Sequence, residues 1–305
     1  MDAIKKRLLR EVAELDSLPV GAYNIREDGA LGGRQTTANI DIKTKTDKPG
    51  IDIIIKPGTV NESVHIPVIM SQSGLHDMVY NDFYIGEGAD VVIIAGCGIH
   101  NGGCGDSAHD GIHTFYIGRG AHVKYVEKHY GEGEGSGKRL MNPTTVLHIA
   151  EGGSMEMETT QISGVDDTLR KTSAELAADA RLVIREKIMT TGTQVAKTDF
   201  SVDMNGEGCS ADVMSRSVAK DQSRQEFDSL INGNAACTGH TECDAIIMDE
   251  GHVLARPCLA ANNIDASLIH EAAIGKIAGE QLIKLMTLGL SEKEAEEQIV
   301  AGFLA

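Results

Sequence analysis

Ile85-Gly86-Glu87-Gly88-Ala89-Asp90-Val91 is the first copy of a repeat that decides the fold of this chain. Close copies begin at residues 117 and 149, a looser one at 176 and degenerate ones at 204 and 231, so successive starts are 32, 32, 27, 28 and 27 residues apart. Each copy joins two short apolar strands through a tight glycine turn, and one such unit cannot bury its apolar face alone. Stacking the units buries that face. The repeat therefore predicts an all-β core, built as a parallel β-helix or roll.

The segment before the repeat begins with a predicted helix over residues 2–16. Its apolar residues follow the spacing of one helical face: Ile4, Leu8, Leu9, Val12 and Leu15. Pro19 and Gly21 then stop the helix. Alternating apolar and polar residues begin at about residue 36 and predict strands.

The segment after the repeat predicts a pair of helices. The first covers Ala278–Leu288 and ends at Gly289, and Ser291 with Glu294 forms a capping box for a second helix that reaches about Phe303. We therefore expect an N-terminal helical segment (1–35), a β-helix core (36–265) and a C-terminal helical region (266–305).

The composition excludes several classes of function. The 305 residues contain 28 Lys and Arg against 45 Asp and Glu, a net charge of -17, whereas a protein that binds a phosphate backbone needs a basic face. No apolar run approaches the roughly 20 residues that span a bilayer. The first residues do not resemble a signal peptide, so we expect a cytoplasmic protein whose six cysteines stay reduced.

Nucleotide and hydrolase sites are also disfavoured. Residues 133–139 superficially resemble a phosphate-binding loop, but Glu132 stands where that loop needs glycine, and Arg139 follows Lys138 where it needs Ser or Thr. The chain has no Gly-x-Ser-x-Gly nucleophile elbow. We expect this chain to bind no nucleotide.

Two groups of cysteine and histidine could bind metal. The first consists of Cys97, His100 and Cys104, with His109 and His113 nearby. Thiolates and imidazoles at this spacing suit zinc, Cu(I) or iron with sulfide. The alternative is a ladder of buried cysteines beside solvent-facing histidines, because free cysteine is among the most buried residue types.

The second group lies near the end of the predicted β-helix and comprises Cys237, His240, Cys243, His252, Cys258, His270 and Glu271. It contains no Cys-x-x-Cys pair and is therefore not an ordinary structural zinc site. Three ligands drawn from strands and a helix junction would form an open, labile site.

The C-terminal residues resemble a known family. Ile269–Ile277, Glu280-Gln281-Leu282 and Gly289-Leu290-Ser291 are similar to the C-terminal signature of the SufB/SufD scaffolds of iron–sulfur cluster assembly, and Glu242–Met248 resembles the segment that carries their cluster-related cysteine. The triplet His270-Glu271-Ala272 is of the SufB type, so the chain resembles a short SufB-like form. The resemblance implies a right-handed parallel β-helix.

The resemblance also implies roles for single residues. Cys243 would hold the nascent cluster, Glu271 would assist as a carboxylate and His270 would handle iron. Further candidate metal ligands are Cys258, His252, Cys97, His100 and Cys104. The structural alternatives are that Glu271 stabilises a helix N-terminus and that His270 is an ordinary core residue.

Partners follow from the same resemblance. A SufC-type ATPase would dock on the C-terminal helices, and two copies of this chain would form a homodimer. A sulfur donor would supply the sulfur, and the cluster would pass to recipient apoproteins. Such a scaffold binds and transfers and is not itself an enzyme. Around Glu250-Gly251-His252 the chain lacks the Cys-Gly-Ala-His stretch expected of the family, which leaves the sulfur-acceptor cysteine unassigned.

Two other functions compete with this interpretation. One is storage of a single metal, zinc or iron, on a β-helix. The other is an enzyme acting on acidic polysaccharide, which a charge of -17 and the lack of Trp disfavour because acidic substrates are steered by basic clefts.

Overall fold

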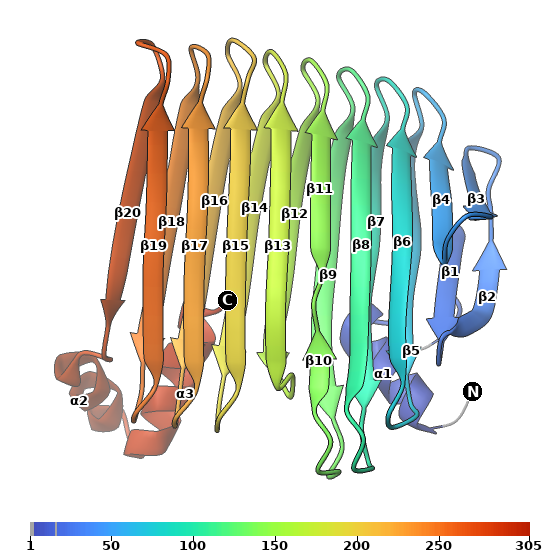
Figure 1. The fold of residues 1–305 in the computed structure, drawn as a ribbon. Coiled ribbons are helices and arrows are strands. Elements are labelled where there is room, and N and C mark those ends of the chain that lie inside the picture. Colours follow the sequence, from blue (N-terminus) through green and yellow to red (C-terminus); the bar gives the residue numbers. More distant parts are fainter. Residues whose placement is uncertain (1–2, 16) are drawn as a thin grey trace.

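A computed structural model of the chain describes residues 3–15 and 17–305 (Figure 1). Its elements, in chain order, are α1 (Ala3–Ala13), β1 (Ala22–Glu27), β2 (Ala30–Gln35), β3 (Ile40–Thr44), β4 (Gly50–Ile55), β5 (Val60–Met70), β6 (His76–Ile85), β7 (Asp90–His100), β8 (Ser107–Ile117), β9 (His122–Glu132), β10 (Arg139–Met141), β11 (Thr144–Ile149), β12 (Ser154–Ser163), β13 (Asp167–Leu176), β14 (Arg181–Thr190), β15 (Val195–Met204), β16 (Ser210–Ala219), β17 (Arg224–Gly233), β18 (Thr238–Ile247), β19 (His252–Ala261), β20 (Ser267–Gly275), α2 (Gly279–Thr287) and α3 (Glu292–Phe303).

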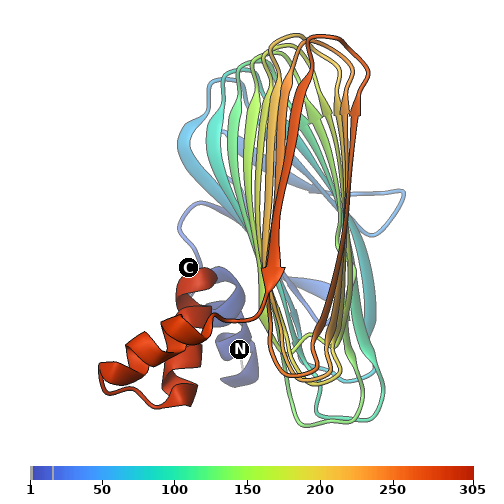
Figure 2. The same cartoon turned by 90° about the vertical axis from the view of Figure 1, so that its left-hand side faces the viewer.

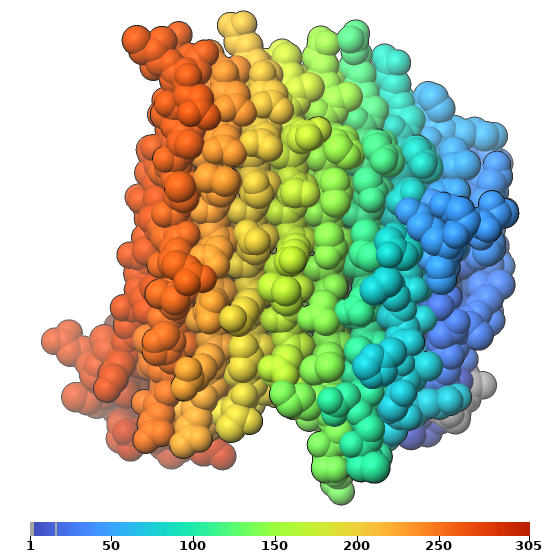
Figure 3. Space-filling view, viewed as in Figure 1, coloured from blue at the N-terminus to red at the C-terminus, as the bar shows by residue number. Residues whose placement is uncertain are grey.

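The strands form two facing sheets that wind along one axis. Sheet A runs in the order β2-β1-β5-β7-β9-β12-β14-β16-β18-β20, and sheet B runs from β19 through β17, β15, β13, β10, β8, β6 and β4 to β3, with β11 between β8 and β13. The long strands pair in parallel, and the antiparallel pairs β1–β2 and β3–β4 lie at the N-terminal end. The space-filling view shows the turns stacked in chain order from one end to the other (Figure 3). The predicted parallel β-helix is confirmed.

The strand register matches the sequence repeat closely. Ile85, Ile117, Ile149, Leu176 and Met204, the first residues of five copies, are paired in one row of sheet B. The sixth copy is displaced. The partner of Met204 is Gly233, whereas the predicted start, residue 231, pairs two residues earlier. The prediction was wrong there because the step from Met204 to Gly233 is 29 residues long, whereas the predicted step is 27 residues.

The turns explain the repeated glycine. Gly88, Gly120 and Gly152 have φ values of 64°, 60° and 65°, a left-handed conformation that favours glycine. Asp179, with φ 54°, occupies the same place in the next turn, because aspartate tolerates this conformation better than most residues. The N–H of each residue donates to the following turn, as from Gly88 to the Arg119 carbonyl at 3.0 Å.

Side chains alternate between the interior and the outer surface along each strand. β13, for example, alternates between buried and exposed residues over its whole length. Interior residues stack on their counterparts one turn away, and the rings of Phe83 and Phe115 lie 4.2 Å apart. Burying such a side chain stabilises the fold by about 1.5–3 kcal/mol.

Helix α1 covers part of the outer face of sheet A, against β5, β7 and β9. Leu8 and Val12 are buried there, and Gly96 makes room, because a Cβ at that position would lie 2.6 Å from the Val12 carbonyl oxygen. The predicted helix 2–16 is present as α1 but ends at Ala13, because Glu14 has a left-handed φ of 55°; residues 2 and 16 lie outside the described residues. The segment 1–35 also contains strands β1 and β2, which were not predicted from the sequence.

The C-terminal helices follow directly on the last strand. β20 extends to Gly275, so the helical region starts at α2 rather than at residue 266. Ser291 and Glu294 form the predicted capping box at the start of α3. The pair projects from the sheet A side of the β-helix (Figure 2). Within residues 3–15 and 17–305, no helix has the length and apolar character needed to cross a membrane.

Candidate functional site

Cys243 points into the β-helix from β18. It is 2% exposed and belongs to the main apolar cluster, where its burial and the nearby charge of Glu186 raise the pKa of the thiol to about 12. Burial disfavours the thiolate because an unpaired charge is costly at low dielectric. The thiol is therefore protonated and unreactive at neutral pH in this conformation.

Cys243 ends a line of polar side chains along the interior of sheet A. Strand register places in one row Glu127, Thr159, Glu186, Ser215 and Cys243, which we call the interior polar row. The Ser215 hydroxyl donates to Glu186 at 2.8 Å. The interior next to Cys243 is thus hydrogen-bonded and polar.

Arg170 crosses from sheet B to hold this row together. It is fully buried, its Nη1 donates to Glu127 at 2.6 Å and its Nε lies 3.4 Å from Glu186. Burial raises the pKa of Glu127, but the charges of His129 and Arg170 outweigh that effect and hold it well below its usual range. One guanidinium therefore forms ion pairs with two buried carboxylates.

Glu271 lies on the opposite face of sheet A from Cys243. It pairs in register with Glu242, whereas Cys243 pairs with Ala272, so Glu271 projects outward while Cys243 projects inward. Ligand atoms of His240, Glu242 and Glu271 all lie within 4.8 Å of one another. We call these three residues the outer His/Glu cluster.

His240 in this cluster has a fixed orientation. Its Nδ1 lies 2.8 Å from Asp212 on β16, and its Nε2 lies 3.5 Å from Glu271. The hydrogen bond to Asp212, followed by the contact with Glu271, raises the pKa of His240 even though partial burial lowers it.

His270 points inward, beside Glu271 in sequence but on the same face as Cys243. It pairs with Thr241, two residues from Cys243 along β18. Its Nδ1 is buried and has no hydrogen-bond partner in the part of the chain that the structure describes. The structure thus places Cys243 and His270 inside the β-helix and Glu271 outside it.

Cys258 and His252 are remote from this arrangement. Both lie on β19, which belongs to sheet B, and both are exposed on its outer surface. Cys237, the residue just before β18, is buried next to Cys209. All six cysteines are free thiols. The second predicted group therefore does not converge on one point.

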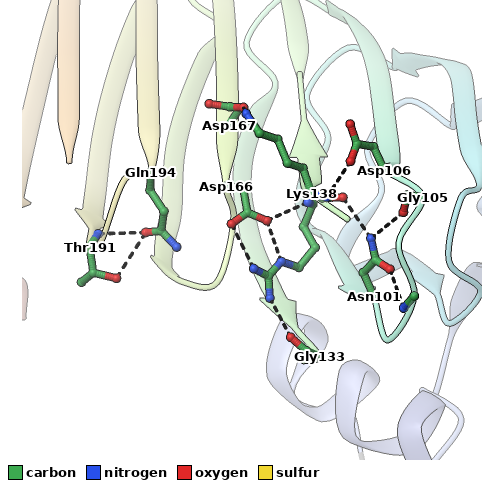
Figure 4. A network of polar contacts seen from close by, with 11 residues as sticks. Asn101, Gly105, Asp106, Gly133, Lys138, Asp166, Asp167, Thr191 and Gln194 are labelled. Carbon is green, nitrogen blue, oxygen red and sulfur yellow. Dashed lines mark hydrogen bonds and ion pairs between the residues drawn. The ribbon is translucent and has the colours of Figure 1, made fainter. Parts of the chain in front are cut away.

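The first predicted group is also dispersed. Cys97 is buried inside β7, His100 projects from the other face with its Nδ1 3.1 Å from Glu132, and Cys104 lies in an exposed loop. That loop is held by Asn101, whose amide donates to the carbonyls of Gly105 and Lys138 (Figure 4). These three residues do not form one metal site.

The residues that do surround Cys97 come from other strands. A small internal cavity of about 20 Å³ is lined by Cys97, His109, His113, Glu127 and His129, among others. Burial lowers the pKa of His113 to about 4, so this imidazole is neutral. Its Nδ1 lies 2.9 Å from the Tyr125 hydroxyl, which in turn donates to Glu127.

Comparison with known proteins identifies the family. A family model described as the SufBD core domain of the SUF system for iron–sulfur cluster assembly matches residues 71–303. The chain belongs to the SufBD family. This confirms the resemblance found in the sequence and connects the protein with iron–sulfur cluster assembly.

Several curated SufBD relatives are archaeal. An iron–sulfur cluster assembly SufBD family protein of Archaeoglobus fulgidus is 30% identical over 227 residues, 74% of this chain and 60% of the relative. One of Methanocaldococcus jannaschii is 29% identical over 255 residues, 83% of this chain and 79% of the relative. One of Methanothermobacter thermautotrophicus is 27% identical over 223 residues, and the match spans 53% of its length. Two of these three SufBD relatives are thus covered over less than two thirds of their length.

Asp212, Arg170 and the two buried glutamates of this SufBD chain were not predicted from the sequence. Asp212 could have been found, because it precedes His240 by 28 residues, one repeat step at this end of the β-helix. Arg170 could not, since it contacts Glu127 from the other sheet at a separation of 43 residues, which matches no repeat.

Proposed function

We propose that this chain is a scaffold of the Suf type, which assembles a nascent iron–sulfur cluster at a homodimer interface and transfers it to apoproteins. A SufC-type ATPase drives the process, and the scaffold itself is not an enzyme and acts in the cytoplasm. The observation that carries the proposal is the position of Cys243, His270 and Glu271 on the last two strands of sheet A in a chain of the SufBD family.

The ligand types suit temporary binding. Stable clusters are usually held by four cysteine thiolates, and one thiolate supported by imidazole and carboxylate holds iron more weakly. A cysteine must lose its proton to bind iron, and the raised pKa of Cys243 opposes this in the closed β-helix. The cluster therefore forms only after the surroundings of Cys243 have changed.

A movement of β20 is the change that the fold favours. Cys243 and Glu271 lie on opposite faces of one sheet and cannot bind the same iron atom in this conformation. Among the described residues β20 pairs only with β18, and residues 276–278 join it to α2. A force that the ATPase applied to α2 would act on β20 through this short connection and could open the interior beside Cys243.

The first test is reconstitution of a cluster on the intact chain. We expect anaerobic incubation with iron and sulfide to give visible charge-transfer absorption in the wild type and none in Cys243→Ser. Cys209→Ser is the matched control, because Cys209 is also a buried thiol inside the β-helix, and it should retain the absorption. Full absorption in Cys243→Ser would contradict the assignment of the cluster ligand.

Metal storage is the second candidate function, and the outer His/Glu cluster is the observation that favours it. The same experiment separates the two functions. Tight stoichiometric binding of zinc, without cluster formation from iron and sulfide, would support storage and contradict the scaffold.

The C-terminal helices offer a surface for the ATPase. α2 has no buried residue, and its exposed apolar side chains include Ile283, at 63% exposure, and Met286. Exposing these apolar side chains does not stabilise an isolated chain. Covering them with a partner contributes about 25 cal/mol of binding free energy per Å² of apolar surface buried. This supports docking of the SufC-type ATPase on α2 and α3.

Ile283→Glu should abolish this docking. When scaffold and ATPase are co-expressed, we expect the ATPase to co-purify with the wild type and to be lost with Ile283→Glu, because a charge would enter an apolar interface. Leu31→Glu is the control, since Leu31 is 59% exposed at the other end of the β-helix. Equal recovery of the ATPase with both variants would contradict docking on α2.

A further inference from the structure

The outer His/Glu cluster has the arrangement of a metal site. His240 and Glu242 project from β18, Glu271 projects from β20, and their ligand atoms lie within 4.8 Å of one another. Because the neighbouring parallel strands are in register, the backbone fixes the positions of the three Cα atoms from which these side chains extend. The site therefore needs only small side-chain adjustments to close around an ion.

A second and independent feature is the orientation of His240. Asp212 lies 2.8 Å from Nδ1, which leaves Nε2 directed at Glu271, 3.5 Å away. Histidines that bind metal usually donate their other ring N–H to a carboxylate, which fixes the tautomer and makes the free nitrogen a better ligand. Asp212 and His240 already form that pair.

The charge around the cluster also favours a cation. Asp212, Glu242, Asp244 and Glu271 bring four carboxylates to adjacent strands, and Glu242 interacts with the like charge of Asp244. The basic groups that act on Glu242 are Arg216 and His240. A divalent ion would relieve the repulsion between the carboxylates, so binding is favoured by more than ligand contacts alone.

We propose that His240, Glu242 and Glu271 bind one divalent first-row transition-metal ion on the outer face of β18 and β20, with Asp212 positioning His240. One imidazole and two carboxylates leave coordination positions open and suit Fe²⁺, Mn²⁺ or Zn²⁺. In the proposed scaffold function, on which this identification of the ion rests, the ion is Fe²⁺ held before it joins sulfide at Cys243. Glu271 thereby acts first from outside the β-helix, away from the thiol.

The test is titration of the 305-residue apo-protein with Co²⁺ alone, monitored by calorimetry and by the ligand-field absorption of the bound ion. We expect one Co²⁺ per chain, with loss of saturable binding in His240→Ala and Glu242→Gln. Asp212→Asn should weaken binding by about 10- to 100-fold, as is typical when the partner of a metal-bound histidine is changed. His148→Ala is the control. His148 also lies beside a carboxylate, with its Nδ1 3.1 Å from Glu175, but on the outer face of sheet B, so this substitution should leave Co²⁺ binding unchanged.

The outcomes separate this site from the scaffold function. Absence of saturable Co²⁺ binding, or unchanged binding in His240→Ala, would overturn the proposal. Cys243→Ser should bind Co²⁺ as the wild type does, because its thiol lies on the other face of the sheet. If Co²⁺ binds at these residues but iron and sulfide form no cluster, the scaffold function fails and the metal site stands.

Discussion

Arg170→Ala is expected to lower the free energy of unfolding by about 3–5 kcal/mol, the usual cost of removing one partner from a buried ion pair. The guanidinium is fully buried and contacts both Glu127 and Glu186. Without it, two carboxylates would remain in the interior without their common cation. The measurement is denaturant unfolding of the wild type and the variant, followed by circular dichroism.

An exposed ion pair provides the matched control for Arg170→Ala. Arg119 contacts Glu151 at 2.9 Å on the surface, where water screens the charges, so Arg119→Ala should change stability by less than about 1 kcal/mol. Equal effects of the two substitutions would contradict the idea that Arg170 stabilises the interior. A larger loss for Arg170 would show that the polar interior near Cys243 depends on this one side chain.

More of the fold than of the site could be predicted, because the fold depends on contacts one repeat apart in the sequence and the site depends on contacts at other separations. A repeat of about 30 residues predicts which residues stack in one sheet, as with Ile85 and Ile117. It also accounts for the turn glycines. It does not predict contacts between the sheets, such as Arg170 with Glu127, since these depend on where each turn crosses the interior.

The site residues show the same limit on a smaller scale. The sequence points to Cys243, His270 and Glu271 because the segments that carry them resemble those of the SufB/SufD family. Their inward and outward directions depend on register, and the register of β20 follows from the length of the turns that precede it. The degenerate last copies conceal that length. The sequence therefore predicted neither that His270 and Glu271 lie on a strand nor the face of the sheet on which each side chain lies.

Loop glycines illustrate a further effect that sequence patterns conceal. Gly133, Gly135 and Gly137 alternate with polar residues, which suggests only a loop. In the structure this loop lies against the turn around Asn101, and a Cβ at Gly135 would lie 2.2 Å from the Gly103 carbonyl oxygen. Gly135 and Gly137 are needed for the close approach of two backbones, which a pattern within the loop does not reveal.

The last prediction concerns the proposed homodimer, whose interface would include the free edge of β20. Ser267 N–H donates to Cys237 and Ala273 N–H donates to Asp244, so the odd-numbered amides of β20 face β18. Alternate amides of a strand point to opposite sides, and the N–H of Ala272 therefore lies on the free edge. An unpaired edge of this kind is a template for pairing with another chain.

Ala272→Pro should weaken this dimer while leaving the pairing of β18 with β20 intact, since proline is tolerated where the missing N–H faces away from the sheet. A hydrogen bond left unmade in the interface costs about 1–3 kcal/mol, and each 1.4 kcal/mol is tenfold in the dissociation constant. Light scattering across a dilution series should give twice the 32.5 kDa chain mass for the wild type and a shift toward the monomer for Ala272→Pro. Ala272→Val keeps the amide and should remain a dimer. If it dissociated equally, the side chain rather than the strand edge would form the interface, and equal dimerisation of all three proteins would place the interface elsewhere.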